Sequence, residues 1–109
     1  MTARRHRVVW TEAAAQDLVQ IAIHVADESP ATARKLIERL RTRASRLSAF
    51  PGRGRVVPEL AGAGVLAYRE IISRPYRILY RRQDRNVIIA AVIDGRRDLE
   101  DVLFERLVR

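Results

Sequence analysis

The chain has 109 residues, of which 48% are hydrophobic, and it contains no cysteine. This length predicts one domain spanning residues 1–109, and the lack of cysteine excludes disulfide scaffolds, Cys-type zinc sites and thiol nucleophiles. The net charge of +8 favours polyanionic partners. Because no apolar run approaches the roughly 20 residues of a membrane span or forms a signal-peptide core, we expect a cytoplasmic protein with no membrane segment.

The N-terminal half predicts a strand followed by two helices. Residues 6–10 are of β type, and Thr11 can cap a helix that ends near Asp27. Ser29 can cap a second helix, whose apolar residues recur at helical spacing as far as Leu47. We therefore expect a helix hairpin that buries its two apolar stripes against another part of the fold.

The C-terminal half predicts three strands and a short helix. Residues 50–64 are interpreted as a turn and a connecting loop, since they begin with Phe50-Pro51-Gly52. Residues 65–72 and 76–82 are rich in β-branched and aromatic side chains and form a predicted hairpin. Residues 87–93 are apolar on both faces, which is typical of a central strand.

The predicted element order is β-α-α-β-β-β-α, an α+β fold. In it an antiparallel sheet carries the helix hairpin on one face, and a short C-terminal helix around Leu99 and Leu103 ends the chain.

Arginine is concentrated in the predicted sheet. Residues 69–97 contain eight arginines and only three acidic residues, Glu70, Asp84 and Asp94. The arginines are Arg69, Arg74, Arg77, Arg81, Arg82, Arg85, Arg96 and Arg97. Guanidinium groups offer forked donors to phosphates and carboxylates, and the tyrosines nearby could stack on bases. We predict a binding surface here; the alternative is a solvated face whose arginine stems cover the sheet.

Other chemistries find no support in the sequence. Gly52 and Gly54 lack the third glycine of a dinucleotide-binding loop, and no Gly-Lys-Ser/Thr run marks a P-loop. His6 and His24 are the only histidines, and no serine lies in a nucleophile elbow. We therefore expect no metal, no cofactor and no classical hydrolase.

Several segments together resemble the RelE/ParE superfamily of toxins, the group that includes plasmid stabilisation proteins. They are Val9-Trp10-Thr11-Glu12-Ala13, Gly54-Arg55, Pro58-Glu59-Leu60, Tyr68-Arg69-Glu70-Ile71, the run from Pro75 to Arg81, and Asp94-Gly95-Arg96-Arg97. The similarity covers nearly the whole chain. It implies the toxin half of a type II toxin-antitoxin pair, held inactive by an acidic, partly disordered antitoxin.

The resemblance also implies a choice between two targets. RelE-like members cleave mRNA on the ribosome, and in such a ribonuclease the catalytic positions here would be Arg69, Arg77 and Arg97. However, Ile71 stands where those members have a lysine, and Leu103, with Phe104 beside it, stands where they have a tyrosine. These departures favour the ParE branch, whose members inhibit DNA gyrase by binding and are not nucleases.

Three functions therefore follow from the sequence, in decreasing order of support. They are a gyrase-inhibiting toxin, a ribosome-dependent mRNA endoribonuclease, and a non-toxic basic nucleic-acid-binding module. The residues predicted to bind the antitoxin or the target are Arg69, Arg74, Tyr76, Arg77, Arg81, Arg96 and Arg97.

Overall fold

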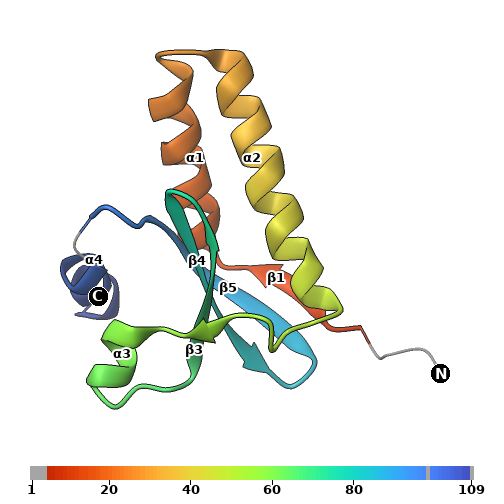
Figure 1. Ribbon diagram of the computed structural model, residues 1–109, viewed down its shortest axis with the longest axis vertical. Coiled ribbons are helices and arrows are strands. Elements are labelled where there is room, and N and C mark those ends of the chain that lie inside the picture. The colour runs from red at the N-terminus through yellow and green to blue at the C-terminus, as the bar shows by residue number, and fades with distance from the viewer. Residues whose placement is uncertain (1–4, 98, 109) are drawn as a thin grey trace.

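A five-stranded sheet with helices on both faces forms the fold (Figure 1). The computed structural model describes residues 5–97 and 99–108, without the side chains of Phe104, Leu107 and Val108. The strands are β1 (Arg7–Trp10), β2 (Arg55–Val56), β3 (Tyr68–Ser73), β4 (Tyr76–Gln83) and β5 (Asn86–Asp94). The helices are α1 (Glu12–Ala26), α2 (Pro30–Ser45), α3 (Pro58–Gly62) and α4 (Leu99–Val108), and a short 3₁₀ turn, η1 (Arg46–Ser48), follows α2.

Both predicted helix caps of the N-terminal half are confirmed. The Thr11 hydroxyl oxygen accepts a hydrogen bond from the Ala14 N–H at 3.1 Å, and the hydroxyl donates to the Ile89 carbonyl at 2.9 Å. The Ser29 hydroxyl accepts from the Thr32 N–H at 3.2 Å. The Thr11 hydroxyl therefore caps α1 and, through its second hydrogen bond, holds the start of the helix against β5.

Two apolar clusters lie on opposite faces of the sheet. The first joins the helix hairpin to the sheet through residues such as Leu18, Leu40, Leu47, Ile78, Tyr80 and Ile89. The second joins α3 and α4 to the other face through Val57, Leu60, Leu79, Ile93, Leu99 and Leu103. Both faces of β4 and β5 are therefore covered, which confirms that the strand at residues 87–93 is central.

The sheet is mixed, which corrects the prediction of a wholly antiparallel one. The strand order is β1-β5-β4-β3-β2, and β1 pairs with β5 in parallel, from Arg7 opposite Asn86 to Trp10 opposite Ile89. The other neighbouring strands are antiparallel. Apolar patterning carries no strand direction, and β1 leads into helices instead of a hairpin, so its pairing was not determined locally.

Two short elements were also missing from the prediction. The segment interpreted as a loop contains β2 and α3, and the following strand begins at Tyr68 instead of residue 65. Elements this short contain too few residues to show a period. The α+β class, the helix hairpin and the C-terminal helix are confirmed. Within the described ranges, no helix is long and apolar enough to cross a membrane.

Candidate functional site

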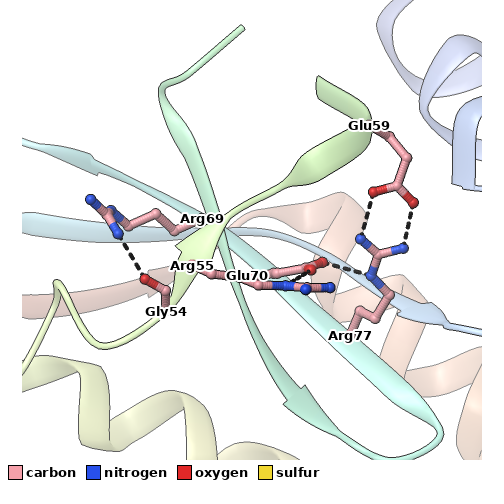
Figure 2. Close-up of polar contacts among 6 residues, drawn as sticks. All are labelled: Gly54, Arg55, Glu59, Arg69, Glu70 and Arg77. Carbon is pink, nitrogen blue, oxygen red and sulfur yellow. Dashed lines mark hydrogen bonds and ion pairs between the residues drawn. The ribbon is translucent and has the colours of Figure 1, made fainter. Parts of the chain in front are cut away.

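Arg77, the central arginine of the predicted surface, is held by two carboxylates (Figure 2). Its two terminal nitrogens donate to the Glu59 carboxylate at 2.7 and 2.8 Å, and its Nε donates to Glu70 Oε1 at 2.6 Å. The Arg77 side chain is only 11% exposed. Its donors are therefore directed at the protein's own acidic groups, and little of the guanidinium faces solvent.

Glu70 lies between two arginines and is fully buried, with 0% of its side chain exposed. Besides Arg77 it accepts a hydrogen bond from Arg55 Nε at 2.8 Å. The pairing of the strands explains the arrangement, because β2 sets Arg55 opposite Glu70 and β3 sets Ile72 opposite Arg77. The charged side chains thus share one face. A carboxylate at this depth requires such partners, since an unpaired buried charge is strongly destabilising.

This pairing shifts the titration of both partners. The hydrogen bonds from Arg77 lower the pKa of Glu59 below its usual value of 4.5. The same hydrogen bonds raise the pKa of Arg77, against the opposing effect of burial. Glu59 therefore stays ionised and Arg77 stays protonated, and each neutralises the other.

Three of the predicted residues lie together around one hollow. This hollow has a volume of about 590 Å³ and is lined by Arg55, Ile72, Arg74, Pro75, Arg77, Gly95 and Arg96. Arg96 is paired with Asp94, with Nη2 to Oδ2 at 2.7 Å, and its hydrogen bonds lower the pKa of Asp94. Within the described residues the exposed Arg74 side chain makes no hydrogen bond or ion pair. Arg74 is therefore the cation of this hollow that can contact a partner without giving up an acidic neighbour.

The remaining predicted residues lie elsewhere. Arg69 donates to the Gly54 carbonyl at 2.7 Å, and Arg81 donates to Gln83 Oε1 at 2.9 Å. Tyr76 is buried in the core on the helix-hairpin side of the sheet. Arg97 lines a separate hollow with Asp17, Val102, Glu105 and Arg106. The structure thus distributes the predicted set over several places.

Sequence reasoning missed Arg55, Glu59 and Glu70 as members of this network. The signal for Glu70 was present, because a hairpin closed by Arg74-Pro75 places Glu70 and Arg77 on one face. Glu59 gave no such signal, since it reaches Arg77 only through α3, an element too short to be predicted.

Two further positions bear on nuclease chemistry. Leu103 is buried in the apolar cluster under α3 and α4, and Ile71 is buried in the cluster under the helix hairpin. Neither side chain can transfer a proton, and both contribute to packing. In the described part of the chain no group of three or more potential metal ligands is found.

The sequence matches a known family over most of its length. Residues 8–99 match the family described as the ParE toxin of the type II toxin-antitoxin system, parDE. The chain belongs to this family. In this ParE-family chain, Arg77 is engaged by Glu59 and Glu70. No curated protein matches the sequence at a significant level.

Among the solved structures that match, two examples are similar to this chain in fold. The chromosomal ParDE system from P. aeruginosa has a TM-score of 0.71 and 23% identity, covering 84% of this chain and 98% of that one. The toxin-antitoxin complex RelBE2 from Mycobacterium tuberculosis has a TM-score of 0.62 and 23% identity, covering 85% of this chain and 94% of that one. At this identity the likeness concerns the fold.

Proposed function

We propose that this ParE-family chain is a toxin that arrests growth in the cytoplasm by binding DNA gyrase, and that it does not cut nucleic acid. The supporting observation is the engagement of Arg77 by Glu59 and Glu70. A phosphate-cleaving site needs cations directed at the developing charge and a group that moves a proton. A salt-bridged Arg77 and a buried Leu103 provide neither at these positions.

Membership of the family supports a cognate antitoxin as the neutralising partner. A hollow of about 400 Å³ lies beside α1 and α2, and apolar side chains including Trp10, Leu18, Val19 and Ile37 line most of it. An amphipathic segment can insert its apolar side chains into such a groove. The net charge of +8 on this chain would attract an acidic partner, so we expect the antitoxin to be acidic and partly disordered.

Two assays on the purified chain test the target. We expect it to inhibit supercoiling by gyrase and to accumulate cleaved DNA complexes, while mRNA on translating ribosomes stays intact. Adding the antitoxin encoded by a neighbouring gene should restore supercoiling. Unchanged gyrase activity together with mRNA cut at codons on the ribosome would overturn the proposal in favour of an endoribonuclease.

Single substitutions test whether the predicted surface contacts gyrase. We expect Arg74→Ala and Arg97→Ala to weaken gyrase inhibition, because both side chains belong to the predicted set and both are exposed. Arg39→Ala on the exposed side of α2 is the matched control. Equal weakening by all three variants, with the fold intact by circular dichroism, would contradict a localised contact surface.

A further inference from the structure

Phe50 is an aromatic ring that the fold leaves in solvent. It is 66% exposed, in the loop that joins η1 to β2. Two hollows adjoin it, one of about 320 Å³ and one of about 720 Å³, and Phe50 lines both. A ring exposed to this extent contributes little to the core, and its face is accessible to a ligand.

Arginines surround this ring without acidic partners. Arg5, Arg46 and Arg53 line the first hollow, and Arg53 and Arg82 line the second. No carboxylate lines either hollow within the described ranges, and none forms an ion pair with these arginines there. We call Arg5, Arg46, Phe50, Arg53 and Arg82 the basic end. It joins the N-terminal segment, the end of α2 and the end of β4, which lie on one side of the molecule in Figure 1.

The loop that carries Phe50 is fixed from both sides. The Ser48 carbonyl accepts from the His6 N–H at 2.8 Å, and the Ser48 hydroxyl donates to the His6 carbonyl at 2.7 Å. After the ring, the buried Tyr80 hydroxyl donates to the Pro51 carbonyl at 2.7 Å and accepts from the Gly54 N–H at 2.9 Å. A partner would therefore meet a platform that is already ordered, which reduces the entropic cost of binding.

We propose that the basic end binds single-stranded nucleic acid, with a base stacked on Phe50 and the flanking phosphates on the arginines. A single strand carries a phosphate on each side of every base, so a base stacked on the Phe50 ring would bring its flanking phosphates close to the surrounding guanidinium groups. An acidic protein segment fits less well, because Phe50 is the one large apolar side chain among the residues lining the two hollows, which leaves few positions for the apolar side chains of a peptide. This activity goes beyond gyrase inhibition and does not rest on it.

Fluorescence anisotropy with a labelled oligothymidine of about 12 nucleotides tests the ring, since sites of this kind span about 4–16 nucleotides. We expect Phe50→Leu to weaken binding about tenfold, because leucine keeps the apolar bulk and loses the stacking face. Leu66→Ala is the matched control, because Leu66 is also 66% exposed and lies away from the basic end. It should leave the affinity unchanged.

The salt dependence of the same binding tests the arginines. Arg53→Gln and Arg82→Gln should each lower the slope of log affinity against log salt by about 0.7, the value for one phosphate contact on a single strand. Arg34→Gln on the exposed face of α2 should leave the slope unchanged. Two results would overturn the proposal: equal effects of Phe50→Leu and Leu66→Ala, or tighter binding of a polyglutamate peptide than of the oligonucleotide at the same salt.

Discussion

The two ends of β4 present arginine in opposite settings. At its start, Arg77 is 11% exposed and bound by Glu59 and Glu70. At its end, Arg82 is exposed, and its one side-chain hydrogen-bond partner among the described residues is His6, with Nη2 and Nε2 3.2 Å apart. The same residue type on the same strand thus stabilises the fold at one end and remains available to a ligand at the other. Charge counted along a sequence therefore does not locate a binding surface; the partners of each charge do.

The largest expected effect is the loss of stability when Arg77, and not Arg82, is replaced by alanine. Arg77→Ala should lower the free energy of unfolding by about 3 kcal/mol, because it leaves the buried Glu70 without one of its partners. Arg82→Ala should change it by less than about 0.5 kcal/mol, as for an exposed side chain. Urea denaturation of both variants gives the comparison. Similar losses at both ends would show that the two settings do not differ.

A second test concerns the close packing beside the Glu70 network. A Cβ added at Gly54 would lie 2.5 Å from the Glu70 carbonyl oxygen and 2.7 Å from the Tyr80 hydroxyl. Gly54→Ala should therefore destabilise the fold by about 2 kcal/mol through overpacking. Gly52→Ala is the control, because nothing lies within 4 Å of a Cβ there. Thermal unfolding of the two variants should separate them, and equal melting temperatures would refute this account of Gly54.

A third test removes the hydroxyl that fixes the loop of the basic end. Tyr80→Phe leaves the Pro51 carbonyl and the Gly54 N–H without their partner, at a cost of about 1.5 kcal/mol. Tyr68→Phe serves as control, since Tyr68 makes no side-chain hydrogen bond within the described residues. Chemical denaturation should show the difference, and a smaller loss for Tyr80→Phe than for Tyr68→Phe would count against the hydroxyl's role.

The smallest expected effect is a pH dependence at the start of β4. The folded-state pKa of Glu59 is lowered by Arg77, so the stability it contributes is present above its unfolded value of 4.5. That stability is lost as the pH falls through the lower folded value. Glu59→Gln should remove this part of the acid destabilisation, by under about 1 kcal/mol for a partly exposed pair. The exposed Glu38→Gln should leave the acid profile unchanged, and an identical profile for both variants would contradict the assignment.

Local signals in the sequence predicted most of the fold. Thr11 and Ser29 correctly predicted where the two helices begin, because an N-cap depends only on the capping residue and the first turn of the helix that follows it. The direction of β1 was not predictable in this way, because it depends on how the chain returns after α2. The helix α3 was missed because five residues carry no usable period.

The candidate sites were less accessible to sequence reasoning than the fold. The arginines were recognised, but the neutralisation of Arg77 depends on Glu59, which is distant in the sequence and contacts Arg77 only in the folded chain. Phe50 was interpreted as part of a turn, and a lone aromatic residue in a turn has no periodicity that reports its exposure. Composition therefore identified the arginine-rich region, and packing decided which side chains are free to bind.

The Tyr80 hydroxyl also constrains how this chain can vary in length. It contacts Pro51 and Gly54 at once, so an insertion or deletion between these two residues would move one of them out of reach. Related chains that keep this tyrosine should therefore keep the same spacing in the loop. Where the tyrosine is replaced, loops of other lengths become tolerable, and the position of the exposed ring is expected to vary with them.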